Sequence, residues 1–169
     1  MIQILIQSLA IIAVTLFLIS FHAKTRKSIL LLQLVGLIIW AVHFFLLNAW
    51  TGAVLMIING IITAIFLFKT DTKKLNNPII LLVALIIFFI VTIVTWTGFY
   101  SLLPFLGVSS ITIAKWQNHP SRIRLISIPA SIFWVIYDSF VGAYGSIIAE
   151  VLIILSIILS LLHNQNDTK

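Results

Sequence analysis

Residues 78–96 read PIILLVALIIFFIVTIVTW and contain no charged side chain. A helix needs about 20 predominantly apolar residues to cross the hydrocarbon core of a bilayer, so this stretch is long enough for one span. The preceding Asn76 and Asn77, together with Pro78, are typical of a helix start. The stretch predicts a helix whose solvent is lipid.

The composition of the whole chain extends this interpretation. Of its 169 residues, 62% are hydrophobic and only 8% are charged, and the mean hydropathy is +1.23. In soluble domains about a quarter of the residues are charged, so a water-soluble enzyme, a disordered tail and a secreted disulfide scaffold are excluded. The chain has no cysteine, which also excludes thiolate metal sites and cysteine nucleophiles.

Similar apolar runs recur along the chain, separated by short polar breaks. They predict an all-α membrane protein with seven transmembrane helices, over residues 1–21, 28–47, 52–68, 78–96, 101–115, 123–141 and 146–163. The first run has basic residues after it and none before it, which is the reverse of a signal peptide. We therefore expect it to remain as a span.

The basic residues test this number of spans. If the loops alternate between two sides, one side receives all ten of them: Lys24, Arg26, Lys27, Lys69, Lys73, Lys74, Lys115, Arg122, Arg124 and Lys169. Under the positive-inside rule that side is the cytoplasm, so we expect the N-terminus outside and the C-terminus inside. Because topology accounts for the net charge of +6, we expect no nucleic-acid partner.

The sequence also resembles itself when it is shifted by 94 residues. Residues 38–43 (IIWAVH) lie over residues 132–137 (IFWVIY), and the turn at 48–52 lies over 142–146. This predicts two parallel three-helix repeats related by an axis along the membrane normal and joined by a linker helix, a 3+1+3 plan. The alternative is chance similarity between apolar helices. The predicted units are a first repeat at 1–69, a linker with the fourth helix at 70–97, a second repeat at 98–163 and a cytoplasmic tail at 164–169.

Polar side chains inside the spans mark a candidate site, because lipid offers them no hydrogen bonds. Glu150 lies in the first turns of the last span and His43 at similar depth in the second, so we expect the two to meet. Asn59 lies near the middle of the third span, and Asp138 ends the sixth, where we expect it to face the outer water. The structural alternative for these groups is an interhelical hydrogen bond or ion pair.

Two aromatic stripes add to this site. Helical spacing places Trp40 and His43 on one face of the second span, and the shift places Trp134 and Tyr137 on the matching face of the sixth. Opposed across the axis, the two Trp rings would form flat walls for a small ligand; the alternative is ordinary helix packing. We expect a substrate pocket between the repeats, lined by Trp40, His43, Asn59, Trp134, Tyr137 and Glu150.

Two prolines within predicted spans are candidate gating residues. Pro104 and Pro129 favour helix kinks, and their counterparts in the first half are not proline. The kinks would serve either as a gate in one half or as fixed bends. No catalytic motif and no metal-ligand spacing is present in the sequence, so we expect neither an enzyme nor a cofactor or metal site.

These motifs resemble the YgjV-type family of small bacterial inner-membrane proteins, and the resemblance covers nearly the whole chain. It implies a multi-pass protein of the bacterial inner membrane, with the N-terminus periplasmic. The residues that carry it are WAVHFFLL at 40–47 with Gly52, Ala53 and Asn59, LLPFLG at 102–107, Trp134 to Ile136, and Glu150.

The 3+1+3 plan is also similar to the SWEET sugar facilitators and the Pnu vitamin transporters, an analogy at the level of the fold. SWEET-type proteins have a proline in each of four gate helices and a pocket asparagine in each repeat. Here only Pro104 and Pro129 match the prolines, and Ile153 stands where Asn59 should have its counterpart. These departures weaken the expectation of a sugar substrate and of a symmetric gate.

The sequence therefore favours a small-solute membrane transporter, either a facilitator or a proton-linked carrier, with its pocket between the repeats. The alternative is a non-transporting accessory or scaffold protein of the membrane. The expected partners are the lipid bilayer and a small polar solute, and a homo-oligomer is left open.

The charge pattern makes a direct prediction about topology. A reporter fused after Lys169 should read cytoplasmic, and one inserted at Thr51 should read periplasmic, because an odd number of spans separates the two positions. Paired reporter fusions measure this. If both reporters read the same side, the number of spans is wrong.

Overall fold

The computed structural model describes residues 2–68 and 78–166. Within these ranges the chain forms seven α-helices and one 3₁₀ turn, η1 (Phe99–Ser101). The predicted spans agree with the helices to within about three residues, which confirms the all-α class. The helices are α1 (Ile2–His22), α2 (Arg26–Leu46), α3 (Trp50–Phe68), α5 (Pro78–Val94), α6 (Leu102–Trp116), α7 (Pro120–Val141) and α8 (Tyr144–Asn166).

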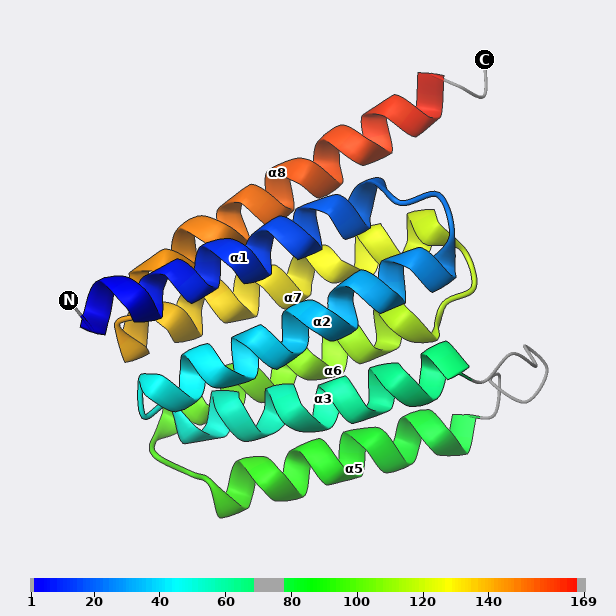
Figure 1. The fold of residues 1–169 in the computed structure, drawn as a ribbon. Coiled ribbons are helices and arrows are strands. Elements are labelled where there is room, and N and C mark those ends of the chain that lie inside the picture. Colours follow the sequence, from blue (N-terminus) through cyan, green and yellow to red (C-terminus); the bar gives the residue numbers. More distant parts are fainter. Residues whose placement is uncertain (1, 69–77, 167–169) are drawn as a thin grey trace.

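Successive helices run antiparallel to one another along the bundle (Figure 1). Among the described helices, α2, α3, α7 and α8 are long and apolar enough to cross a membrane, while α5 and the part of α1 from Ile6 are shorter apolar helices. Four of the described helices therefore have the length and composition of membrane spans.

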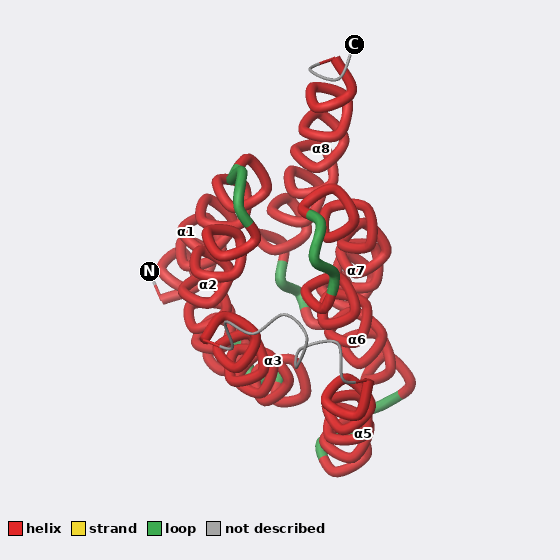
Figure 2. The backbone as a smooth tube through the Cα atoms, turned by 90° about the vertical axis from the view of Figure 1, so that its right-hand side faces the viewer, coloured by secondary structure: helices red, strands yellow, loops and turns green. Residues whose placement is uncertain are grey.

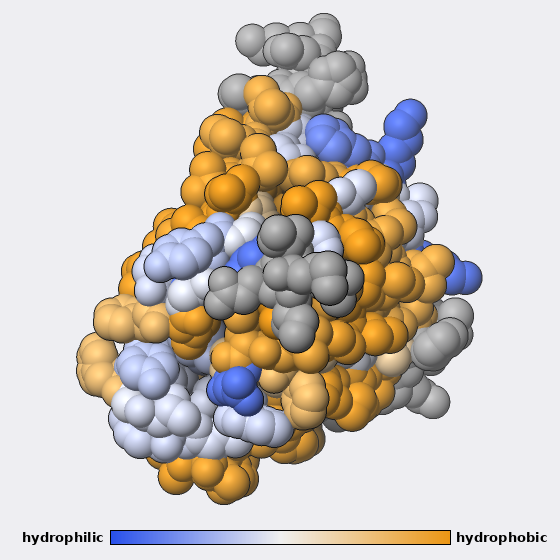
Figure 3. All heavy atoms as spheres, turned by 60° about the vertical axis from the view of Figure 1, so that its left-hand side comes forward, coloured by the Kyte–Doolittle hydropathy of each residue, from blue (hydrophilic) through white to orange (hydrophobic). Residues whose placement is uncertain are grey.

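The outer surface of the bundle is apolar. Large hydrophobic side chains are exposed on every α-helix, and Figure 3 shows such side chains over most of the face it presents. On α5 the only buried side chains are those of Ala84, Phe88 and Thr92. Soluble monomers rarely expose a contiguous apolar surface of this kind, whereas lipid acyl chains solvate it.

Six of the described helices form a closed ring. Around it each helix packs on the next in the order α1, α2, α3, α6, α7, α8, and α8 packs back on α1. Helix α5 lies outside the ring, against α3 and α6 (Figure 2). In this order α3 and α8 are opposite walls of the ring, as are α2 and α7.

Two turns at the same end of the ring have the same geometry. Asn48 after α2 and Gly142 after α7 both adopt left-handed backbone conformations, with φ of 57° and 71°. In each turn the next amide donates across six residues to a helix carbonyl, from Ala49 to Phe44 and from Ala143 to Asp138, both at 2.9 Å. This is the Schellman end of a helix, and it occurs twice, 94 residues apart.

The two prolines lie in different settings. Pro104 is in the first turn of α6, where backbone N–H groups have no intrahelical acceptor, so it interrupts no helical bond. Pro129 lies inside α7, which remains helical from Pro120 to Val141. Only Pro129 therefore removes a bond from the interior of a helix.

Glycine at position 107 allows α6 to approach α7 closely. A Cβ atom there would lie 2.6 Å from Trp134 Nε1, and the Trp134 ring is held by Phe44, which stacks on it at 5.3 Å between centroids. Gly60 on α3 is different, because a Cβ atom there would be 4.0 Å from its nearest neighbour.

We predict that Gly107→Ala destabilises the protein by about 1–3 kcal/mol, the usual effect of overpacking, and lowers Tm by several degrees. The matched variant Gly60→Ala should leave Tm unchanged or raise it, since alanine favours helix. Thermal unfolding in detergent, followed by tryptophan fluorescence, measures both. Equal stability of the two variants would contradict the described packing of Trp134.

Candidate functional site

The ring of helices encloses a cavity of about 30 Å³. That volume accommodates one or two water molecules. All six ring helices contribute to its wall: the lining residues are Phe17, Phe21, Leu37, Trp40, Met56, Asn59, Ile111, Ser127, Ala130, Ser131, Trp134, Glu150 and Ile153.

Most of the lining comes in pairs separated by 94 positions in the sequence. The members of each pair lie on opposite helices of the ring, so the cavity is central to it. The pairs are Phe17 with Ile111, Leu37 with Ser131, Trp40 with Trp134, Met56 with Glu150, and Asn59 with Ile153.

Four of the six predicted pocket residues line this cavity, namely Trp40, Asn59, Trp134 and Glu150. His43 and Tyr137 are buried but are not among the lining residues. The expected pairing of His43 with Glu150 is not formed, because both ring nitrogens of His43 have other partners. Nδ1 lies 2.9 Å from the Ile6 carbonyl oxygen, and Nε2 lies 3.0 Å from Ser146 Oγ.

Glu150 instead turns toward α7. Its side chain is 8% exposed, and the hydroxyl of Ser131 is its polar neighbour on α7. Asp138, which we expected to face the outer water, is 1% exposed and interacts electrostatically with Glu150. Neither carboxylate oxygen of Asp138 has a hydrogen-bond partner among the described residues. Glu150 thus lines the cavity, and Asp138 is a second buried carboxyl group near Glu150, without a bonded cation among the described residues.

The opposite side of the cavity holds a buried lysine that the sequence reasoning placed in a basic loop. Lys115 is fully buried near the end of α6, and its Nζ donates to Asn59 Oδ1 at 3.1 Å and to Thr63 Oγ1 at 2.8 Å. An ammonium group only donates hydrogen bonds, so Asn59 must turn its oxygen toward Lys115. This bond leaves the amide N–H groups of Asn59 available to other partners.

Aromatic side chains close the cavity at the end where α2 and α7 finish. Phe44 stacks on Trp40 at 5.8 Å and on Trp134 at 5.3 Å between ring centroids. We had expected the two Trp rings to stand as bare opposed walls, but the Phe44 ring stacks on both of them. Tyr137 covers the same region, with its ring and hydroxyl lying against Gly52 on α3.

Two arginines bind backbone carbonyl groups at the other end of the bundle. Arg26 binds carbonyls where α6 ends, and Arg124 binds carbonyls where α1 ends. Such orphan carbonyls need donors, and a charged donor strengthens the bond. The bonds are Arg26 Nη2 to Lys115 O (3.0 Å), Arg26 Nε to Gln117 O (3.2 Å), Arg124 Nε to Phe21 O (2.8 Å) and Arg124 Nη2 to Ala23 O (3.2 Å). The four acceptors again form two pairs separated by 94 positions.

The sequence reasoning missed Lys115, Asp138 and Phe44 for identifiable reasons. Lys115 and Asp138 stand near helix ends, where a charged side chain usually reaches water, and Phe44 has no polar atom to mark it. A signal for Lys115 was available, because Ile111 and Lys115 are one helical turn apart and share a face.

Comparison with known proteins places the chain in a family. A family model, Imp-YgjV, described as a bacterial inner membrane protein, matches residues 4–168. Neither a curated protein nor a solved structure matches the chain.

We predict that Lys115 and Asn59 are energetically coupled. Asn59→Leu leaves the buried ammonium short of an acceptor and should lower the free energy of unfolding by about 2 kcal/mol. Adding Lys115→Met removes the stranded charge, so the double variant should recover at least about 1 kcal/mol of that loss. Denaturation of the wild type, the two single variants and the double variant in detergent measures this double-mutant cycle. Strictly additive changes in the free energy of unfolding would refute the contact.

Proposed function

The chain belongs to the Imp-YgjV family of bacterial inner membrane proteins, and from this premise we propose that it is a small-solute transporter. Its binding site is the central cavity, and it works as a facilitator or as a proton-linked carrier. The observation that carries the proposal is the presence of Glu150 and Asn59 in the otherwise largely apolar lining of this cavity. Polar and ionisable side chains at membrane depth are costly and mark substrate paths, and a bound solute would give both groups a partner.

The proposal includes an architecture of two parallel three-helix repeats, α1–α3 and α6–α8, with α5 as the linker. It is supported by the paired lining residues and by the two Schellman turns at Asn48 and Gly142. It is also supported by the reciprocal bonds of Arg26 and Arg124. Solute sites at the interface of two repeats are typical of transporters built in this way.

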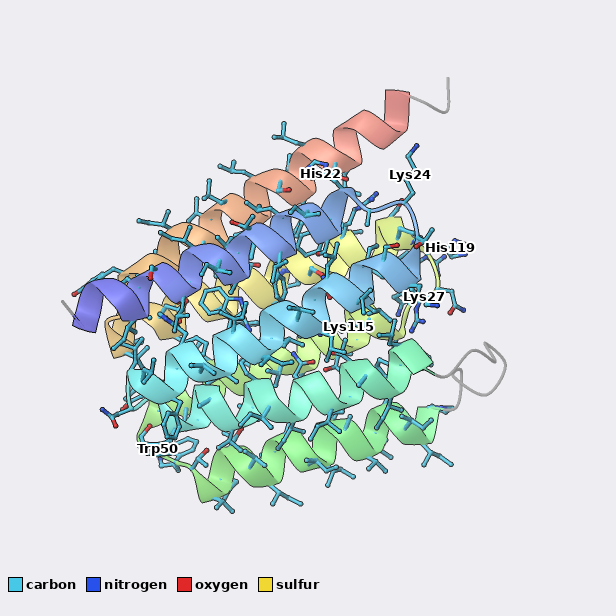
Figure 4. The ribbon with its side chains drawn as sticks, in the orientation of Figure 1. His22, Lys24, Lys27, Trp50, Lys115 and His119 are labelled. Atoms are coloured by element: carbon cyan, nitrogen blue, oxygen red, sulfur yellow. The ribbon has the colours of Figure 1, made fainter. Side chains whose placement is uncertain are left out.

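The proposed topology has all seven helices crossing the inner membrane, with the N-terminus periplasmic and the C-terminus cytoplasmic. Figure 4 places Lys24, Lys27 and His119 at one end of the bundle and Trp50 at the other. The basic end would then be cytoplasmic under the positive-inside rule, and the aromatic closure would face the periplasm.

Transport requires each end of the cavity to open in turn. On the periplasmic side this means breaking the His43–Ser146 bond and separating Tyr137 from Gly52. On the cytoplasmic side it means releasing the carbonyls held by Arg26 and Arg124. We propose Pro129 as a bending point of α7 in this motion, since it removes an internal helical bond.

The alternative function, a non-transporting accessory or scaffold protein, is favoured by a different feature. A wholly apolar groove of about 510 Å³ lies on the outside of the ring between α2 and α3. Residues such as Ile38, Phe45 and Ile61 line it, and a lipid chain or an apolar helix would fit there. The polar cavity has no role in that function, so the two proposals differ in their predictions.

We predict that the purified protein binds a small polar solute and carries it across a bilayer. A thermal-shift screen against sugars, vitamins, carboxylates and amino acids should find a stabilising solute, because a ligand at 100 times its Kd adds about 2.7 kcal/mol. Proteoliposomes should then take up the labelled solute.

The matched variants are Trp40→Ala in the cavity and Trp50→Ala on the exposed surface. Trp40→Ala should abolish the thermal shift and the uptake, while Trp50→Ala should retain both. Absence of any stabilising solute and of any flux would favour the accessory or scaffold function.

A further inference from the structure

The charges around the cavity assign it a class of solute. We propose that the transported solute is a small zwitterion, whose ammonium group binds at Glu150 and whose carboxylate binds at Asn59, backed by Lys115. This inference rests on the proposed transport function and specifies its substrate.

The wall formed by α7 and α8 attracts cations. Glu150 lines the cavity together with Ser127 and Ser131, and Asp138, a second buried acidic side chain, interacts electrostatically with it. The other ionisable groups that neighbour Asp138 are Tyr137 and, through Tyr137, Tyr100. On α2, both ring nitrogens of His43 already have hydrogen-bond partners, the Ile6 carbonyl and the Ser146 hydroxyl. No basic side chain is therefore bonded to either carboxyl group in the described part of the chain.

The wall formed by α3 and α6 attracts anions. Lys115 is fully buried, and the atoms that accept its hydrogen bonds are neutral oxygens of Asn59 and Thr63. Among the described residues no carboxylate is bonded to this buried cation, and such an arrangement is unusual because burial removes the hydration of the charge. Asn59 transmits the effect of this charge to the cavity. Its side-chain oxygen accepts a hydrogen bond from Lys115, so its N–H groups remain for a ligand.

A singly charged ligand would satisfy one wall and leave the other uncompensated. An acetate-like molecule could bind at Asn59 but would meet Glu150 as a like charge, and an amine would meet Lys115 in the same way. A molecule with both charges compensates both walls at once, since Asn59 and Glu150 stand on opposite helices of the ring, α3 and α8. Between them lie Trp40 and Trp134, whose ring faces favour an ammonium group.

The size of the cavity limits the solute. At about 30 Å³ it is close to the volume needed for one or two waters, so the ring must expand even for a molecule of five or six heavy atoms. Glycine and alanine are the zwitterions of that size, and they serve as the probes.

The test compares glycine and alanine with the two halves of glycine, acetate and methylammonium. Thermal shift of the full-length protein in detergent and uptake of labelled glycine into proteoliposomes are the readouts. We expect glycine or alanine to raise Tm and to be taken up, and acetate and methylammonium to bind at least about tenfold more weakly, because each lacks one charge-assisted contact.

Charge-removing variants sharpen the test. Lys115→Met should bind glycine at least about tenfold more weakly than the parent and methylammonium more tightly. Glu150→Gln should likewise bind glycine at least about tenfold more weakly, and it should bind acetate more tightly than the parent. Lys27→Met removes an exposed lysine at the same end of the bundle and should bind glycine as the parent does. The wild-type comparison stands even if a variant does not fold.

The outcomes distinguish a failure of the zwitterion assignment from a failure of the transport function. If acetate or methylammonium alone matches glycine, or if a sugar or vitamin binds while glycine and alanine do not, the zwitterion assignment is overturned and the transporter survives. If no solute binds and none crosses the bilayer, the transport function fails together with it.

Discussion

The bilayer offers no hydrogen bonds, so every polar group at membrane depth must be satisfied within the protein. The ring of six helices is the arrangement that meets this constraint here: its outside is apolar and its polar side chains point inward. Arg26 and Arg124 show the constraint at the helix ends, where each binds carbonyls on the opposite half of the ring. Around the cavity the constraint is only partly met, since Asp138 has no hydrogen-bond partner for its carboxylate within the described residues.

Many cavity-lining positions pair at a spacing of 94 residues, but the polar side chains among them do not. Glu150 and Asn59 both occupy positions whose counterparts, Met56 and Ile153, are apolar. Lys115 has Phe21 as its counterpart, 94 positions earlier. The shared pattern thus supplies a central cavity with aromatic walls, and substitutions in single positions give its two sides opposite character. A site of this kind suits a solute with two different ends rather than one with twofold symmetry.

The fold was largely predictable from the sequence, and the site only in part. Hydropathy and turn residues located the helices, because a span must be long and apolar and a left-handed turn favours Gly or Asn, as at Gly142 and Asn48. The 94-residue shift placed Trp40 opposite Trp134, and Asn59 was marked as a pocket residue by its polar side chain near the middle of a predicted span. Sequence could not reveal side-chain direction near helix ends, so Asp138 was assigned to water and His43 to Glu150. Those choices depend on the packing of neighbouring helices, which no single-helix periodicity contains.

The central claim is that the cavity is a water-accessible path for solute, and cysteine labelling tests it directly. The chain has no cysteine, so Ile153→Cys, which lines the cavity, can be compared with Leu152→Cys on the exposed apolar face. A small water-soluble thiol reagent reacts with the thiolate, which needs water to form. The account predicts that in native membranes the reagent labels position 153 and not 152. Labelling of 152 alone, or of neither position, would contradict it.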